Sequence, residues 1–291
     1  MTTELAPGMR LPVPLGLDAF GSRGTADQGY LIGQLLGDGS LTGSSVKWCG
    51  HLDGAREEMQ RVVEGMGDRL SLWNIQESNG LHEYGVVHRE KVRNATTGSV
   101  LSLMRREGLW GSKGADKYLR HMDYSREFCI RFIEGLIDSD GSIDPRKNVD
   151  ISTISERLMR QVQEILQWLG IQSRVSRRKN SGGFGRNPSD LWSVHIKARD
   201  DILTLRGLIT LHANNTRGIR KDQVLDQLVA VKLPKHGRRN NDGNPMVGGE
   251  IQNVAWDRIR FVDHVGARNT FRIVERPDEA VIRGGILGLR G

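Results

Sequence analysis

The sequence predicts an α+β protein made of two similar halves, each with the order helix, two strands, helix, two strands, helix. A repeated motif is the first reason: IGQLLGDGSL at 32–41 and IEGLIDSDGS at 133–142 place Asp38 and Asp140 in register, 102 positions apart. After each motif comes a stretch with helical spacing that ends in glycine, followed by stretches in which apolar and polar residues alternate. A motif that recurs with the same surroundings indicates an internal duplication.

Each further element can be placed by its periodicity. Apolar residues at helical spacing predict the second helix of each half at 52–67 and 155–170, where Gly67 and Gly170 end the pattern. Alternation predicts strands at 71–78, 83–90, 172–179 and 191–198. A last helix is predicted to begin near Gly98 and near Asp200.

The halves are expected at 26–126 and 127–232. The rest of the chain is an N-terminal extension, a basic linker rich in Gly, Asn and Pro, and a C-terminal extension whose short alternating patches predict added β structure. These three segments span 1–25, 233–249 and 250–291.

Composition restricts the class of protein. The 291 residues carry 42 Lys and Arg against 35 Asp and Glu, a net charge of +7, which suits a polyanion such as nucleic acid and also suits simple solubility. Cys49 and Cys129 lie far apart, so neither a disulfide framework nor a zinc site is indicated. Because no apolar run reaches the ~20 residues of a membrane span and the start lacks a secretory signal, a cytoplasmic protein without a membrane partner is expected.

The repeated motif places small residues where two helices can approach closely. In a helix Gly33 and Gly37 lie on one face, as do Gly135 and Ser139 in the second copy. Glycine destabilises a helix by up to about 1 kcal/mol relative to alanine, so close packing of two helix backbones is expected to compensate. If these helices pair around a pseudo-twofold axis, Asp38 and Asp140 meet at their C-terminal ends.

Two adjacent carboxylates at the negative ends of helices repel each other, so one must take a proton or a divalent cation must bind both. Oxygen ligands favour Mg²⁺, with water and a substrate phosphate completing the shell, and such a site can hydrolyse a phosphodiester. A single Asp-Gly after a helix is often only a cap and turn. Two copies in register favour the cation site instead.

The segments LIGQLLGDG (31–39) and IEGLIDSDG (133–141) resemble the doubled signature of the LAGLIDADG homing endonucleases, in the single-chain form with both motifs. The resemblance extends over about 26–232. It implies two αββαββα halves, whose motif helices form the interface and whose antiparallel sheets form a saddle over DNA. It also implies that Asp38 and Asp140 are metal-binding catalytic acids, with Gly37 and Ser139 beside them at the metal site.

Family members housed in inteins also place a lysine late in each half. GLWGSKGADKYLR (108–120) resembles that pattern of Gly, Lys and a following Ile-Pro, with Lys117 as the match, although the proline is absent. Lys221 in GIRKDQVLDQL is the counterpart by register. Either lysine could stabilise charge on the phosphate or tune the attacking water, and a solvated surface role is the alternative.

Sequence recognition is expected from alternate residues on the sheets, one face of which would lie in the major groove. The stretch 174–186 has five basic residues, no acid and a glycine-rich tip, which suits a hairpin arm along the DNA backbone. A charge run of this kind is otherwise a solvated face. The candidate DNA-binding residues are Lys47, Trp73, Asn74, Gln76, His88, Arg89, Arg174, Arg177, Arg178, Lys179 and Arg186.

The C-terminal extension resembles part of an intein. Residues 254–275 are similar to the strand that leads into the C-terminal splicing block, but the chain ends GGILGLRG without the closing His-Asn, and its start lacks a splice-site Cys or Ser block. Protein splicing is therefore not expected. An endonuclease that is descended from an intein, or that exists apart from one, fits better.

The resemblance implies a monomeric, site-specific DNA endonuclease that makes a double-strand break with short 3′ overhangs in a long, asymmetric duplex. It would use two or three Mg²⁺ ions, with Mn²⁺ able to substitute and Ca²⁺ able to bind without turnover. Two alternatives share the fold: an RNA maturase and a non-catalytic DNA-binding regulator. Both motif aspartates are present, which favours the enzyme.

Overall fold

The computed structural model describes most of the repeat and short parts of both extensions. The described residues are 10–17, 19–76, 81–88, 99–181, 189–232, 254–258, 281–283 and 286–288. The chain divides into two compact units, one of residues 18–236 and one of residues 1–17 with 237–291. No helix within the described part is long and apolar enough to cross a membrane.

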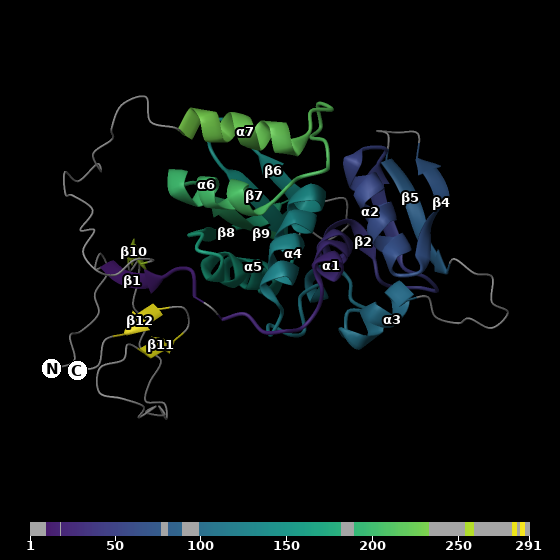
Figure 1. The fold of residues 1–291 in the computed structure, drawn as a ribbon, viewed down its shortest axis with the longest axis horizontal. Helices are drawn as coiled ribbons and strands as arrows, with labels where there is room; N and C mark the ends of the chain where they lie inside the picture. The colour runs from purple at the N-terminus through teal and green to yellow at the C-terminus, as the bar shows by residue number, and fades with distance from the viewer. Residues whose placement is uncertain are drawn as a thin grey trace. The chain divides into compact units, whose positions relative to one another are not determined.

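The larger unit contains two halves with the same order of elements (Figure 1). The first half consists of α1 (Ala26–Asp38), β2 (Gly39–Ser40), β3 (Lys47–His51), α2 (Gly54–Gly65), β4 (Asp68–Gln76), β5 (Leu81–His88), α3 (Ser99–Arg106) and a short 3-10 helix (Gly114–Asp116). Its strands form one antiparallel sheet in the order β2-β3-β5-β4.

The second half repeats this arrangement and adds a helix. It consists of α4 (Arg126–Asp140), β6 (Gly141–Ile143), β7 (Val149–Thr153), α5 (Glu156–Trp168), β8 (Arg174–Ser181), β9 (Ser189–Ile196), α6 (Arg199–Leu208) and α7 (Lys221–Lys232). Its antiparallel sheet has the matching order β6-β7-β9-β8. The predicted α+β fold of two pseudo-symmetric αββαββα halves is therefore confirmed.

The helix boundaries follow from local chemistry. Thr25 and Gln28 form a reciprocal capping box at the start of α1, and the Ser125 hydroxyl accepts a hydrogen bond from the backbone N–H of Phe128 at the start of α4. The turns after α2 and α5 contain Gly67 and Gly170, whose φ angles of 86° and 83° lie in the left-handed region that favours glycine. The glycines that predicted the helix ends are thus required by the backbone.

The motif helices α1 and α4 lie side by side between the two sheets, and their backbones touch at glycines. A Cβ built on Gly33 would lie 2.5 Å from the carbonyl oxygen of Phe132, and one built on Gly135 would lie 2.4 Å from the carbonyl oxygen of Tyr30. Real Cβ atoms do not approach this closely, so only glycine permits the observed separation at both positions.

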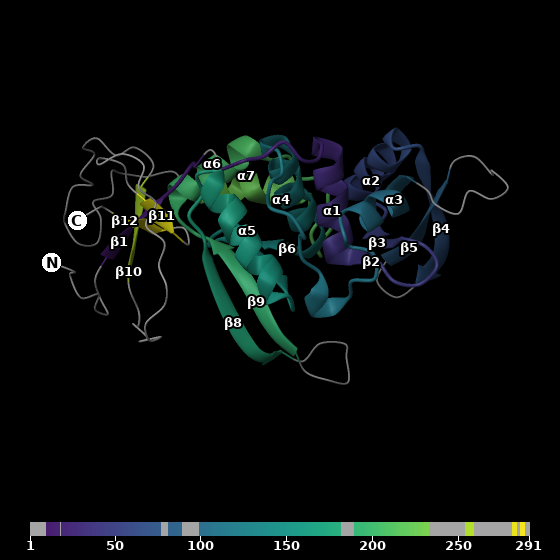
Figure 2. The ribbon, with the colours of Figure 1, turned by 90° about the horizontal axis from the view of Figure 1, so that it is seen from below.

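Each sheet uses one face for the core. In the second half Val149 and Ile151 of β7 and Val194 and Ile196 of β9 are fully buried, and α5 lies beside these strands (Figure 2). The residues between them in sequence point to the opposite side because side chains alternate along a strand. We call that opposite side, which carries Asp150 and His195, the open face of the second sheet.

An ion-pair network joins the halves near α2. Glu58 of α2 accepts hydrogen bonds from Arg61, with Nε at 2.9 Å, and from Arg131 of α4, which also bonds to Glu134. Burial raises the pKa of Glu58, but the hydrogen bonds and charges of the two arginines outweigh it and lower the pKa to about 2. The carboxylate therefore stabilises the folded state.

The smaller unit joins the two ends of the chain. β1 (Arg10–Pro14) pairs antiparallel with β10 (Val254–Arg258), and β11 (Val281–Arg283) pairs with β12 (Ile286–Gly288). The sequence did not predict β1, because Pro12 and Pro14 lack the backbone N–H that a strand normally offers to its neighbours. The basic linker at 233–249 lies outside the described residues.

Gly135→Ala is expected to lower the free energy of unfolding by about 2 kcal/mol, because the new methyl group collides with backbone rather than with a movable side chain. The matched control is Gly207→Ala on α6, where a Cβ would meet nothing within 4 Å. That change should instead be neutral or stabilising by up to about 1 kcal/mol. Urea unfolding of both variants measures the difference, and equal effects would contradict the close approach.

Glu58→Gln is expected to lower the free energy of unfolding by about 2 kcal/mol at pH 7, because the folded-state pKa lies below the ordinary 4.5. This stabilisation is fully present above pH 4.5 and is lost as the pH falls through about 2. The gap in melting temperature between wild type and variant should therefore narrow in acid. Glu57→Gln, an exposed neighbour on α2, is the control, and a gap independent of pH would contradict the assignment.

Candidate active site

The helices α1 and α4 end at the two motif aspartates, and each chain then enters a strand through Gly39 or Gly141. Near this end a Cβ built on Gly37 would lie 2.1 Å from Ser139 Oγ and 3.3 Å from Asp140 Oδ2. The Asp140 carboxylate of the second half therefore lies against the backbone of the first. The predicted interface residues Gly33, Gly37, Gly135 and Ser139 all lie at this helix contact.

The carboxylates of Asp38 and Asp140 interact electrostatically. Burial raises the pKa of Asp140 to about 7, and the nearby charge of Asp38 adds to this effect, whereas Lys117 and Lys221 oppose it. Burial also raises the pKa of Asp38, against the lowering effect of Lys221, Lys117 and His51. Both residues are nevertheless exposed, so solvent reaches the pair.

The predicted lysines lie at the ends of the motif helices. Lys117 Nζ donates to the carbonyl oxygens of Leu35, Gly37 and Gly39 at 3.3, 3.2 and 2.6 Å. Lys221 Nζ donates to those of Ile137, Asp138 and Ser139 at 2.7, 2.8 and 3.5 Å.

The lysines satisfy carbonyl groups that a helix leaves without partners at its C-terminus, and their charge matches the negative end of the helix dipole. Burial lowers the pKa of both lysines, and Asp38 and Asp140 act in the opposite direction. Lys221 is only 6% exposed. Each lysine thus brings a positive charge within electrostatic range of both aspartates.

The loop after Lys117 and the loop before Lys221, which we call the lysine loops, each form hydrogen bonds with the opposite half. The backbone of Leu119, two residues after Lys117, exchanges two hydrogen bonds with the Gln161 side chain of α5, at 2.9 and 2.8 Å. In the other direction the backbone N–H of Asn214 donates to Asp53, the N-cap of α2, at 2.8 Å. Both halves are therefore needed to position either lysine.

One feature of the site has no symmetric counterpart. Asp138, 5% exposed, accepts hydrogen bonds from Tyr30 Oη at 3.0 Å and from the backbone N–H groups of His212 and Ala213 at 3.1 and 3.0 Å. Loss of hydration raises its pKa to about 6, although these backbone donors lower it. Leu36 occupies the matching position of α1. Only the second half therefore ties its lysine loop to the motif helix in this way.

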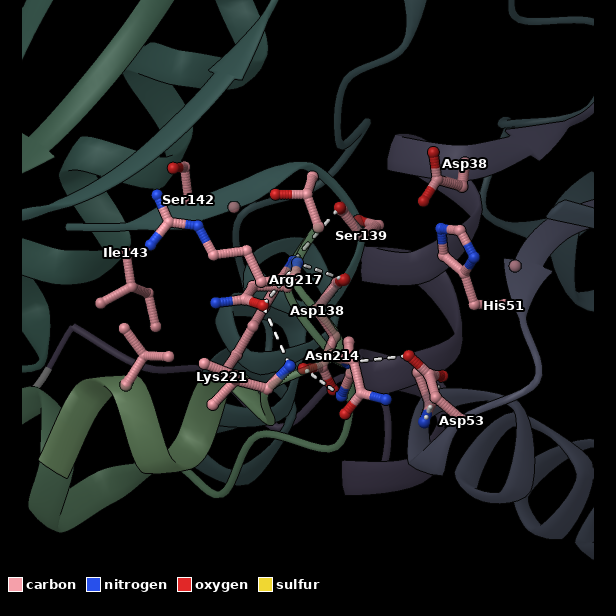
Figure 3. Close-up of a pocket in the computed structure, with 18 of the residues that line it drawn as sticks. Asp38, His51, Asp53, Asp138, Ser139, Ser142, Ile143, Asn214, Arg217 and Lys221 are labelled. Carbon is pink, nitrogen blue, oxygen red and sulfur yellow. Dashed lines mark hydrogen bonds between the residues drawn. The ribbon is translucent and has the colours of Figure 1, made fainter. Parts of the chain in front are cut away.

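A cavity of about 790 Å³ opens beside Asp38, and His51, Asp53, Asp138 and Lys221 are among its other lining residues (Figure 3). Figure 3 shows the His51 ring beside the Asp38 carboxylate. The sequence analysis missed His51. Lys47, Cys49 and His51 alternate along β3 on one side of the strand, so the alternation that singled out Lys47 could also have indicated His51.

Four of the proposed DNA-binding residues lie on β8. Arg174 and Arg178 are exposed on the open face of the second sheet, and Lys179 is exposed near a register shift. Arg177 lies on the core side of the same strand, where it forms an ion pair with Asp190 and lies over the Trp192 ring.

The remaining candidates belong to the first sheet or fall outside the description. Lys47 forms an ion pair with Glu83 at 2.5 Å, and His88 ends β5 on the strand side shared by Tyr84 and Val86. Trp73 is the extra residue at a bulge in β4. The side chains of Trp73, Asn74 and Gln76, and all of Arg89 and Arg186, lie outside the described residues.

The donor set suits a hard divalent cation. The site offers two carboxylates, and the carbonyl oxygens of Gly37 and Ser139 already accept hydrogen bonds from the lysines. Among the described residues, no group of three or more His, Cys, Asp or Glu side chains could hold a metal ion. A cation here would need water or substrate oxygens for most of its shell, which is how Mg²⁺ commonly binds.

The sequence repeat, the helix pair and the two carboxylates can be compared with known proteins. Residues 127–210 match the LAGLIDADG-like domain model. This LAGLIDADG-like segment runs from α4 to the end of α6 and so covers most of the second half. No curated protein matches the chain.

Three solved structures illustrate the similarity. The N-terminal LAGLIDADG domain of DUF199/WhiA is 15% identical, with a TM-score of 0.43 over 64% of this chain and 85% of that one. Full-length DUF199/WhiA from Thermatoga maritima is 13% identical, with a TM-score of 0.46 over 77% and 66%. I-DmoI in complex with DNA and Ca is 14% identical, with a TM-score of 0.42 over 63% and 88%.

Asp138→Leu is expected to lower the free energy of unfolding by about 3 kcal/mol, because it leaves the buried N–H groups of His212 and Ala213 without an acceptor. Tyr30→Phe removes a single donor to the same carboxylate and should cost about 1 kcal/mol. Urea unfolding at pH 7.5 measures both. A leucine variant as stable as wild type would show that the loop does not depend on Asp138.

Proposed function

We propose that the protein is a site-specific, metal-dependent DNA endonuclease of the LAGLIDADG type. The observation that carries the proposal is the pairing of Asp38 and Asp140 at the ends of α1 and α4, each with a lysine bound to the carbonyl groups of the same helix end. Two carboxylates with two ammonium groups close by suit metal-dependent hydrolysis of a phosphodiester.

Asp38 and Asp140 would hold the divalent cation. Loss of hydration and the charge of Asp38 raise the pKa of Asp140, and the two lysines only partly offset this rise. A bound cation would stabilise the ionised carboxylate and so lower its pKa. Two or three Mg²⁺ ions, with Mn²⁺ as a substitute and Ca²⁺ as a non-productive ligand, belong to the proposal. When bound, such a cation supplies an activated water and neutralises charge on the phosphate.

The two lysines would stabilise negative charge on the scissile phosphates. Each is fixed by helix-end carbonyls, so its ammonium group needs little rearrangement to act. His51 lies beside Asp38 in the first half, whereas Thr153 occupies the matching position of the second. The two catalytic centres would therefore be unlike, which suits an asymmetric target.

Duplex DNA would lie along the open face of the second sheet and the corresponding face of the first sheet, which also points away from the core. Exposed Arg174 and Arg178 would contact phosphates or guanines, and the basic stretch that includes Lys179 would follow the backbone. Because one chain carries both halves, a monomer would suffice. A double-strand break with short 3′ overhangs in a long target, and descent from an intein-housed enzyme, complete the proposal.

Asp38→Asn and Asp140→Asn should each reduce Mg²⁺-dependent cutting by about a hundredfold or more while target binding in Ca²⁺ is retained, since each change removes a charge from the cation site without removing its shape. Cleavage of a randomised duplex library by wild type identifies the target. Both variants are then assayed on that target for strand scission and for binding.

Asp27→Asn is the matched control, because it makes the same change at the far end of α1 and should leave cutting intact. Binding by wild type without scission would support a DNA-binding regulator. Preference for structured RNA over duplex DNA would support a maturase. Undiminished cutting by the Asp38 and Asp140 variants would exclude these residues from catalysis.

A further inference from the structure

Three side chains on neighbouring strands form a hydrogen-bonded chain on the open face of the second sheet. Asp150 of β7 lies 2.5 Å from His195 of β9, between Oδ1 and Nδ1. His195 Nε2 in turn lies 2.6 Å from the Oγ of Ser176 on β8. The three residues come from strands that pair side by side in the order β7-β9-β8, so the sheet itself sets their spacing.

This chain faces away from the hydrophobic core. Val175, next to Ser176, is packed against the core, as are Val194 and Ile196 on either side of His195. Strand alternation therefore directs Ser176 and His195 to the opposite side. Exposed Arg174 and Arg178 flank Ser176 on that side, so a polyanion bound there would lie over the serine.

With a neutral His195 ring, the chain orders its hydrogen bonds in one direction. Asp150 Oδ1 accepts from the Asn148 side chain, and in this arrangement it also accepts from His195, whose single ring proton lies on Nδ1. Nε2 then presents a lone pair. Ser176 donates its single hydroxyl hydrogen to that lone pair. The Ser176 oxygen is left able only to accept from a ligand.

We propose that Ser176 is a specificity-determining residue that accepts a hydrogen bond from a base amino group in the major groove, either N6 of adenine or N4 of cytosine. A serine hydroxyl ordinarily reads donors and acceptors alike, and it is the His195 lone pair that removes this ambiguity. Each base pair shows an amino group on one strand and a carbonyl on the other. Ser176 therefore favours A or C over G or T at one position of one strand.

The inference rests on the proposed DNA binding and is tested by profiling target preference from a randomised duplex library, by binding in Ca²⁺ and by cutting in Mg²⁺. Wild type should prefer A or C over G or T by about tenfold at one position, the scale of one unsatisfied polar group in an interface. Ser176→Ala should abolish the preference at that position alone.

His195→Phe supplies the decisive second variant. It keeps a ring on the sheet but removes the lone pair, so the Ser176 hydroxyl regains its freedom to donate, and discrimination at the same position should fall to about twofold or less. Ser152→Ala, which alters the Ser152–Ser193 pair on the same side, is the control and should keep the A or C preference there.

Three results would overturn the inference: an unchanged profile for Ser176→Ala, full discrimination by His195→Phe, or a G or T preference at the Ser176-dependent position. Labelling of Ser176 by a fluorophosphonate would also overturn it, because the same Asp-His-Ser connectivity activates serine as a nucleophile. If wild type selects no DNA, the proposed function itself fails. If wild type selects a target and Ser176→Ala has the same profile, the inference about Ser176 fails while the proposed function stands.

Discussion

The contact between the backbones of α1 and α4 is the constraint on which the rest of the structure depends. Gly33 and Gly135 each place a carbonyl of the partner helix where a side chain would otherwise be. That closeness brings the C-terminal ends of both helices to one point, and with them Asp38 and Asp140. The same closeness adds to the effect of lost hydration on the pKa of Asp140, because carboxylates at converging helix ends lie in each other's electric field and near the negative ends of two helix dipoles.

The surrounding residues compensate for this concentration of negative charge. Lys117 and Lys221 bind the free carbonyl groups of the helix ends, and Asp138 fixes the loop that precedes Lys221. Within the described residues the first half has no such contact, because Leu36 occupies the position on α1 that corresponds to Asp138 on α4. The two halves thus share a motif aspartate and a lysine each, and differ in the residues that hold the lysine loop in place.

Much of the fold could be predicted because it depends on local signals. The repeat, the apolar periodicity of α2 and α5, and the glycines at 67 and 170 all act within a few residues of the position that they determine. β1 could not be predicted, because its prolines are unusual in a strand and its partner β10 lies more than two hundred residues away.

The side-chain arrangements were harder to predict. The position of His51 beside Asp38 depends on the short β2–β3 hairpin that follows Asp38, and the Asp150–His195–Ser176 chain depends on the register of three strands. Alternation shows which residues share a side of a strand. It does not show which residues of neighbouring strands stand opposite each other, because register follows from tertiary packing.

The exchange of lysine loops between halves has a consequence for recombining such proteins. The Gln161 side chain binds the loop of Lys117, and Asp53 binds the loop of Lys221, so each of these loops is held by a residue of the other half. A chimera that joins one half to a half from another protein would keep both motif aspartates at the helix interface. It would lose the hydrogen bonds that Gln161 and Asp53 make to the loops of the opposite half. The halves are therefore not fully independent modules, and a graft that keeps both loops in place must transfer Gln161 and Asp53 together with the loops that they bind.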